Sequence, residues 1–223
     1  MSVTVDTRDC TALTDGDLEE IVNALGGQSA EFGVGHLSKA KEEWVLATTA
    51  RVDEKLHGVL FATLERIGGT PCVLLGLMSI KRSSKCDSVL KGLMGEAYHR
   101  ALMAFPDEDV LFGTRFVAAD GFEVLKQLTD IVPRPGHKPV GEERAWGRRL
   151  AKRFGHEGSY DEQAFQVRGN GSLSSHADFV SSKPEKIDPD VAALFAGVTA
   201  AKGDCLMACG WVMAESLLKL GAR

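Results

Sequence analysis

The sequence lacks any long apolar run. No stretch of about 18 apolar residues, the length that a membrane-spanning helix needs, occurs anywhere in the 223 residues. The first nine residues carry Asp6, Arg8 and Asp9 at positions where a secretory signal has an apolar segment. We therefore expect a cytoplasmic protein that does not act in a membrane.

An excess of basic residues is also missing. The chain has 26 Lys and Arg against 31 Asp and Glu, a net charge of -5. Proteins that bind nucleic acid usually carry a basic domain, so no nucleic-acid partner is expected. Apolar residues make up 44% of the chain, enough for a core of its own. We expect a single domain over residues 1–223, in which residues 133–223 are partly a C-terminal extension that completes the sheet.

Cysteine is scarce, and no cluster of metal ligands is visible. Five cysteines are an odd number spread over the whole chain, which favours reduced thiols over a disulfide framework. Cys205 and Cys209 would face the same way on a helix, but no histidine or second cysteine pair of zinc-site spacing lies near them. The six histidines are isolated from one another. We expect no metal cofactor.

Several common catalytic motifs are absent. The chain has no GxSxG nucleophile turn, no GxxxxGK[ST] phosphate loop and no GxGxxG dinucleotide fingerprint. These absences disfavour a hydrolase of that class, a nucleotide kinase and a nicotinamide-dependent dehydrogenase.

The first half of the chain predicts a helix followed by a strand meander. Thr14 is a suitable N-cap for a helix that ends at Leu25, and residues 28–41 show no clear period. Three strands are then predicted at residues 44–52, 58–66 and 71–80, the last two joined by the turn signal Gly68-Gly69. The third strand is almost continuously apolar, which is typical of a central strand covered on both faces.

After the central strand, the pattern predicts an amphipathic helix at residues 88–105 and an apolar strand at residues 109–117. A short helix capped by Asp120 follows. The remaining chain predicts a helix at 141–154, a strand at 163–168, a loop at 169–186 and a helix at 189–195. Residues 204–220 fit a buried strand followed by a helix, with one continuous helix as the alternative. The predicted fold is α/β (α+β), with a mixed, largely antiparallel central sheet flanked by helices.

In layout, residues 14–130 resemble the GNAT superfamily of acyl-coenzyme A dependent N-acyltransferases. In that family an N-terminal helix precedes antiparallel strands, and the long central strand ends in a basic turn. The start of the next helix then holds the coenzyme A pyrophosphate. The physical reason is general, because unpaired amides at a helix start bind phosphate. The resemblance implies a GNAT-like fold and an acyl-coenzyme A co-substrate, acetyl-coenzyme A or another acyl form.

The family's signature at this turn is Gln or Arg, two residues, Gly, one residue, then Gly or Ala. It falls on residues 82–87, where Arg82 matches and Lys85 and Asp87 replace the two small residues. An aspartate at that position repels pyrophosphate unless it caps the helix or points away. The coenzyme A-binding residues that the resemblance implies are Ser79, Ile80, Lys81, Arg82, Lys85, Cys86, Asp87 and Ser88.

The family's usual acid and base are missing. Residues 72–80 contain no acid that could serve as the base of the central strand, and residues 118–130 contain no tyrosine. Replacement catalytic residues are Glu65, on the strand beside the central one, and Asp120. For Glu65, a solvent-facing carboxylate beside Arg66 is an equally good interpretation. Arg115 is the polar residue hardest to leave unpaired in an apolar strand, so it either pairs with an acid or binds an anionic substrate.

These observations favour an N-acyltransferase that moves an acyl group from acyl-coenzyme A to an amine by direct attack. The acceptor is expected to be a small molecule or a peptide, and a homodimer is open. The alternative is a GNAT-like protein that has lost catalysis and serves in binding or regulation. A third hypothesis is an unrelated α/β enzyme whose site lies in residues 169–186 and the C-terminal segment.

Overall fold

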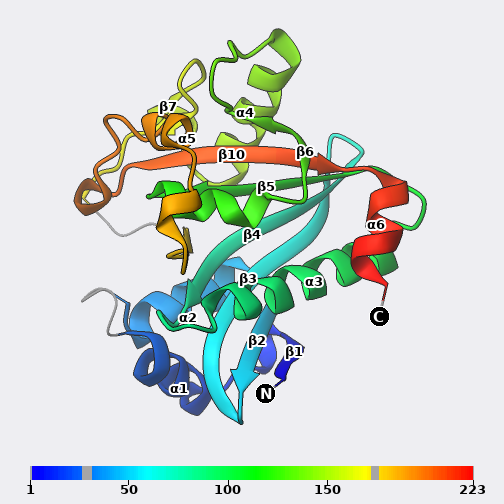
Figure 1. Cartoon of the computed structure of the whole chain (residues 1–223), viewed down its shortest axis with the longest axis vertical. Helices are drawn as coiled ribbons and strands as arrows, with labels where there is room; N and C mark the ends of the chain where they lie inside the picture. Colours follow the sequence, from blue (N-terminus) through cyan, green and yellow to red (C-terminus); the bar gives the residue numbers. More distant parts are fainter. Residues whose placement is uncertain (1, 27–31, 172–175, 223) are drawn as a thin grey trace.

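The computed structural model describes residues 2–26, 32–171 and 176–222. Its centre is a large twisted sheet in which β4, the predicted central strand, has neighbours on both sides (Figure 1). The strands follow the order β1-β2-β3-β4-β5-β10-β8-β7, while β6 pairs with β10 and β9 pairs with β4. Helices cover both faces.

The first four strands form an antiparallel meander. They are β1 (Val3–Asp9), β2 (Leu46–Val52), β3 (Lys55–Ile67) and β4 (Thr70–Ile80). The β2–β3 turn places Asp53 and Glu54 at φ 48° and 65°, and the β3–β4 turn places Gly68 and Gly69 at φ 59° and 90°. Two successive left-handed residues match the twist of the strands that they connect.

Beyond β4 the chain crosses over and returns in parallel. Helix α3 (Cys86–Ala104) leads to β5 (Val110–Phe116), which pairs in parallel with β4. Strand β10 (Cys205–Val212) is antiparallel to β5 on its other side. A parallel pair needs such a crossover, because its two strands start at the same end of the sheet.

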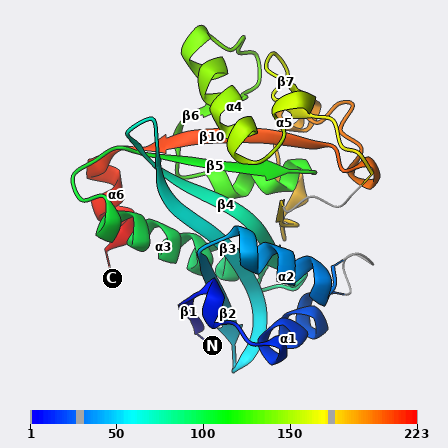
Figure 2. The same cartoon turned by 180° about the vertical axis from the view of Figure 1, so that it is seen from behind.

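Two apolar cores lie on opposite faces of this sheet. One is formed with α3 and α6 (Ala214–Gly221), which face the viewer in Figure 1. The other is formed with α1 (Asp15–Leu25), α2 (Val34–Glu43) and α4 (Gly141–Arg153), which face the viewer in Figure 2. The alternation along β5 shows the division, because Phe112 contacts Tyr98 of α3 while Gly113 lies against Leu150 of α4.

Short elements complete the chain. They are η1 (Cys10–Ala12), η3 (Ala119–Leu125), β6 (Thr129–Val132), η4 (Glu157–Ser159), β7 (Tyr160–Asp161), β8 (Gln166–Val167), β9 (Ala177–Asp178), η5 (Pro184–Lys186), α5 (Pro189–Ala193) and η6 (Ala200–Lys202).

The predicted fold class is confirmed, and so is the strand followed by a helix at the C-terminal end. Strand β1 and helix α2 were not predicted. Strand β1 lies at the edge of the sheet with its residues at most half-buried, and α2 buries Leu37 and Ala40 alone, too few for a recognisable stripe. The predicted capping role of Asp120 is wrong: Ala118 is the N-cap of η3, a 3₁₀ helix, and the Asp120 carboxylate accepts a hydrogen bond from the Ser181 amide.

None of the helices in residues 2–26, 32–171 and 176–222 combines the length and the apolar character that a bilayer crossing requires. Over the same residues, no group of three His, Cys, Asp or Glu side chains is arranged to hold a metal ion.

Candidate active site at the gap between β4 and β5

Strands β4 and β5 pair over a short distance and then diverge. Their parallel register covers Cys72 to Leu74 on β4. Farther along, β4 pairs instead with β9, in a register that joins Met78 to Ala177 and Ser79 to Asp178. The Met78 amide donates to the carbonyl of His176 at 3.1 Å, and β9 also contacts β5. The chain's own 177–178 strand therefore occupies the gap where the two central strands separate.

The predicted basic turn follows β4 directly and leads into α3. The Lys81 amide donates to the carbonyl of His57 at 2.8 Å, and Lys81 and Arg82 carry exposed side chains. Lys85 is the N-cap of α3 and makes no side-chain capping bond. The eight residues predicted to bind coenzyme A thus lie together at the end of β4 and the start of α3, with Ser79, Ile80 and Cys86 buried. Whether they bind coenzyme A stays a prediction.

Asp87, in the first turn of α3, is bound by a distant part of the chain. Both its carboxylate oxygens accept hydrogen bonds from Ser182, one from the hydroxyl and one from the amide at 3.4 Å. The hydroxyl bond is the largest cause that lowers the pKa of Asp87. The next residue back, Ser181, donates its amide to Asp120 at 2.8 Å. The 176–183 segment is therefore fastened both to the start of α3 and to η3.

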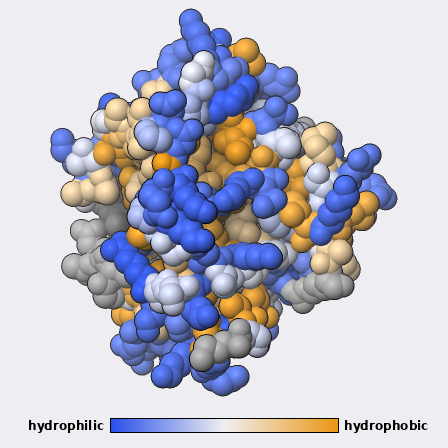
Figure 3. Space-filling model, in the orientation of Figure 1, coloured by the Kyte–Doolittle hydropathy of each residue, from blue (hydrophilic) through white to orange (hydrophobic). Residues whose placement is uncertain are grey.

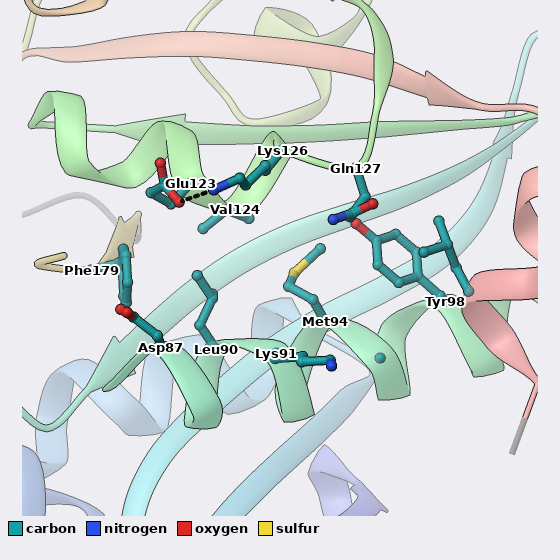
Figure 4. Close-up of a pocket in the computed structure, with 12 residues that line it drawn as sticks. Asp87, Leu90, Lys91, Met94, Tyr98, Glu123, Val124, Lys126, Gln127 and Phe179 are labelled. Atoms are coloured by element: carbon teal, nitrogen blue, oxygen red, sulfur yellow. Dashed lines mark hydrogen bonds and ion pairs between the residues drawn. The ribbon is translucent and has the colours of Figure 1, made fainter. Parts of the chain in front are cut away.

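A groove of about 470 Å³ runs between α3 and η3 beside this segment (Figure 4). Its apolar lining includes Leu90, Met94 and Val124, with Phe179 at the end near Asp87. Figure 3 shows apolar side chains at the bottom of a hollow in this face, surrounded by hydrophilic ones. The other lining residues are Asp87, Lys91, Gly95, Tyr98, Glu123, Lys126, Gln127 and Leu220.

Tyr98 marks the inner end of the groove. From Asp87 to Tyr98, α3 covers about 16 Å at 1.5 Å per residue. The Tyr98 side chain is 3% exposed, and its hydroxyl has no hydrogen-bond partner among the described residues. Burial raises the pKa of this hydroxyl, so it stays protonated and can donate. A buried donor without a partner is costly, which makes Tyr98 a candidate contact for a ligand in the groove.

The structure does not bring the two predicted catalytic carboxylates together. Glu65 lies opposite Cys72 in the β3–β4 register, whereas Ser79 lies opposite Val59. Glu65 is six residues from Val59 on β3, so at 3.2–3.4 Å per residue it lies about 20 Å from the end of β4 that leads into the basic turn. Its carboxylate accepts a hydrogen bond from Arg153 Nε at 2.7 Å, so it belongs to an ion pair between β3 and α4. Asp120, in contrast, lies beside the groove, bound to Ser181.

Arg115 points to the opposite face of the sheet. It is 3% exposed, lies opposite Met207 of β10, and makes no salt bridge with a described residue. Its Nη1 donates to His156 Nε2 at 2.9 Å, and its guanidinium stacks on Phe154 at 4.4 Å. The sequence left two interpretations of Arg115, pairing with an acid and binding an anionic substrate. No acid pairs with it in the described part of the chain. Arg115 instead lines a second cavity.

The sequence indicated residues 169–186 as a loop that could belong to a site, but it did not predict the pairing of residues 177–178 with β4, and it did not single out Tyr98. Residues 172–175 of the predicted 169–186 loop lie outside the described residues. The apolar residues Ala177 and Phe179 in an otherwise polar stretch were the available signal, and both are buried. Tyr98 resembles its apolar neighbours in the α3 stripe, so nothing in the sequence distinguishes it from a core residue.

No protein-family model and no curated protein sequence matches the chain. Solved structures of similar fold include an IAA acetyltransferase from Bacillus cereus, at 9% identity and a TM-score of 0.44, over 95% of this chain and 100% of that one. A Bacillus subtilis acetyltransferase in complex with CoA has 16% identity and a TM-score of 0.39, over 58% and 80% of the chains. An aminoglycoside 6'-N-acetyltransferase from Enterococcus faecium has 14% identity and a TM-score of 0.39, over 50% and 61%.

At these identities the likeness concerns the fold alone, and no substrate or site residue carries over from it. The mixed, largely antiparallel sheet that the sequence predicts is confirmed by the strand order and the α3 crossover of this chain itself.

Proposed function

We propose that the protein is an acyl-coenzyme A dependent N-acyltransferase whose acyl donor binds in the groove between α3 and η3. The observation that carries the proposal is the position of this groove. It runs along α3 from the helix start to Tyr98, and its lining includes Phe179, the residue after the β9 strand that pairs with β4 where β4 and β5 diverge. Its volume lies in the range of small-molecule sites, and its lining is largely apolar.

Each part of the groove suits a different part of such a donor. The start of α3, where the N-cap Lys85 makes no side-chain capping bond and Lys81 and Arg82 lie in the preceding turn, suits the phosphates. Leu90, Met94 and Val124 suit an uncharged arm. The Tyr98 hydroxyl can donate one hydrogen bond inside the groove.

In the proposed reaction, the lone pair of a neutral amine attacks the carbonyl carbon of the thioester. The new C–N bond forms and the C–S bond breaks, so the products are an amide and the free thiol of coenzyme A. The amine gives up one proton and the leaving sulfur gains one. An acceptor that arrives as an ammonium ion also releases one proton to solvent. Positioning the two reactants can supply a large share of the rate acceleration, so a site poor in bases remains consistent with this chemistry.

Whether the 176–183 segment moves decides between this proposal and a second candidate function. With β9 paired to β4 and Ser182 bound to Asp87, the gap between β4 and β5 is occupied. A transferase requires this segment to shift when the donor enters. If the segment instead stays in place, the protein is a GNAT-like binding or regulatory protein without catalysis. The occupied gap and the missing tyrosine and strand acid favour this second candidate.

Calorimetric titration with acetyl-coenzyme A at low and moderate salt tests the proposal. We expect micromolar binding that weakens with salt, because the phosphates meet exposed cations. The double variant Arg82→Glu, Lys85→Glu should lose binding with an unchanged melting temperature, since both residues lie in a surface turn. The matched control Lys152→Glu, Arg149→Glu changes the same charges on the exposed side of α4 and should bind normally. No binding at millimolar donor, or equal binding by both double variants, would overturn the proposal.

The acceptor, the acyl group and the location in the cell are also parts of the proposal. The acceptor is an amine of a small molecule or a peptide, the expected acyl group is acetyl, and the expected location is the cytoplasm. A homodimer remains a prediction, to be checked by light scattering.

A further inference from the structure

The second cavity lies on the face of the sheet opposite the groove. It has a volume of about 530 Å³ and is formed by α2, the chain after α4, and the turns around residues 169 and 203. Its lining residues are His36, Lys39, Glu43, Arg115, Phe154, Gly155, His156, Gly158, Ser159, Arg168, Gly169, Asn170 and Gly203. The cavity is therefore rich in cations and in glycine.

Arg115 is the unusual member of this lining. Although it is 97% buried, its Nε and Nη2 atoms have no hydrogen-bond acceptor among the described residues. Its one hydrogen bond to a described residue goes to His156, and the Phe154 ring covers one face of the guanidinium. Because an arginine can only donate, the His156 Nε2 atom is the acceptor and the ring proton sits on Nδ1.

His156 does not balance the charge of Arg115. Burial, and then the neighbouring Arg115, lowers the pKa of His156 to about 4, so the ring is neutral near pH 7. The charged and titratable groups facing Arg115 from other elements are Cys205 of β10, Glu43 of α2 and Arg153 of α4. Glu43 is exposed at the cavity and forms no salt bridge within the described residues. A buried cation with two open donors normally has an oxyanion beside it.

The rim of the cavity adds further cationic groups and close backbone. Lys39 projects from α2 without an ion pair to any residue described. Arg168 also lines the cavity; its guanidinium donates to the carbonyl of Gly197 and lies 3.7 Å from the carboxylate of Asp204. Gly155 and Gly203 adopt φ values of 76°, and a Cβ on Gly169 would overlap the Lys202 carbonyl. These glycines allow the left-handed turns and the close contact between two backbone segments that form the rim.

We infer that this cavity binds a small anionic molecule through a carboxylate or phosphate group held by Arg115. Two parallel donors of one guanidinium match the two oxygens of such a group. If the proposed function is correct, this molecule is the acceptor, since Arg115 lies beyond Gly113, the last residue of β5 that pairs with β4, where the two strands diverge. The binding of the anion itself does not depend on the proposed function.

The test uses the whole chain without coenzyme A, so its outcome is separate from that of donor binding. The Arg115 Nε–H signal is followed by ¹⁵N side-chain NMR at constant ionic strength, with succinate and inorganic phosphate as probes. We expect saturable binding of at least one probe, with a shift of the Arg115 signal. The tighter probe identifies the group as carboxylate or phosphate. No shift up to about 10 mM of either probe would overturn the inference.

Three variants make the test specific, and calorimetry measures their affinity for the probe, because a chain without Arg115 has no Nε–H signal to follow. Arg115→Met should weaken binding about tenfold to hundredfold, while its matched control Arg149→Met, on the exposed face of α4, should bind normally. Glu43→Gln should bind the probe more tightly, because a competing carboxylate is removed. Arg115→Met should also melt no lower than the parent chain, since replacing a buried unpaired charge by an apolar side chain is often neutral or stabilising.

Equal binding by Arg115→Met and the parent chain would place the anion elsewhere and refute the inference. If Arg115→Met does not fold, Arg115→Lys is used, with its affinity for the probe measured by calorimetry. It keeps the charge but loses the paired donors, so it should bind the probe more weakly. A lysine variant with full affinity would contradict the assignment of the guanidinium as the anchor.

Discussion

Ser182 and Asp87, 95 positions apart in the chain, are joined by two hydrogen bonds at the start of α3. In the proposed function, the start of that helix is where the phosphates of the donor bind. Here the carboxylate of Asp87 occupies this position, and Ser182 of the 176–183 segment donates two hydrogen bonds to it. Asp87 therefore has a physical role as the attachment point of this segment, whose strand β9 pairs with β4 in the gap between β4 and β5.

The first prediction concerns this attachment. Ser182→Ala should bind acetyl-coenzyme A about fivefold more tightly than the parent chain. That factor corresponds to the loss of a hydrogen bond worth about 1 kcal/mol that holds the segment in place. Calorimetry measures the affinity. Ser216→Ala, on α6, serves as the control and should leave the affinity unchanged. Weaker binding by Ser182→Ala would mean that the segment helps to hold the donor instead.

The second prediction concerns pH. The hydrogen bonds from Ser182 lower the pKa of Asp87 below the ordinary value of 3.8. A lowered pKa means that the attachment is fully present above that ordinary value and is lost as the pH falls through the lowered one. Amide-exchange protection of residues 176–183, corrected for intrinsic rates, should therefore be constant from pH 7 to 5 and fall toward pH 3. In Asp87→Asn it should already be low at pH 7, and a variant as protected as the parent would refute this role.

Tyr98 provides the third prediction. Tyr98→Phe removes a buried hydroxyl that has no partner in the described residues, so the free protein should be as stable as the parent or up to about 1 kcal/mol more stable. If the hydroxyl binds the donor, the same change should weaken acetyl-coenzyme A binding several-fold. Thermal unfolding and calorimetry give the two readouts. A loss of stability with unchanged affinity would show that Tyr98 has a structural role alone.

Glu65 is the subject of the fourth prediction. It forms a partly exposed ion pair with Arg153, far along the strands from the basic turn. Glu65→Gln should cost no more than about 1 kcal/mol of unfolding free energy. It should also leave acyl transfer, measured by amine-dependent thiol release, at the parental rate. A large drop in turnover with normal donor affinity would restore Glu65 as a catalytic residue.

The fifth prediction tests the packing behind the site. A Cβ on Gly76, in the middle of β4, would lie 2.1 Å from the Trp44 ring, and Trp44 is almost fully buried. Gly76→Ala should therefore destabilise the fold by about 1–3 kcal/mol. Gly35→Ala, in α2 with open space around it, should be neutral or slightly stabilising. Denaturant unfolding of both variants distinguishes this close contact from a general intolerance of alanine.

The sequence predicted the parts of the fold that repeat a pattern over many residues. The apolar run of β4 and the stripe of α3 both extend far enough to identify the element and its burial. Helix α2 escaped notice because two buried residues form no periodic pattern. Strand β9 has two residues and is a strand only because β4 offers it hydrogen-bonding partners.

The site was predictable to a lesser extent. The basic turn followed from its place between β4 and α3, and Arg115 stood out as a polar residue in an apolar strand. The contact of Ser182 with Asp87 depends on how the chain returns after 95 positions, and no local pattern encodes it. The unpaired donors of Arg115 likewise depend on which side chains of α2, α4 and β10 meet around them.

The measurement that tests the account most directly is amide hydrogen exchange, resolved by peptide, with and without acetyl-coenzyme A. If the donor enters the groove and displaces the 176–183 segment, exchange in this segment should become faster while the first turns of α3 become protected. Unchanged exchange in both regions at millimolar donor would contradict the account and leave the binding or regulatory function as the better explanation.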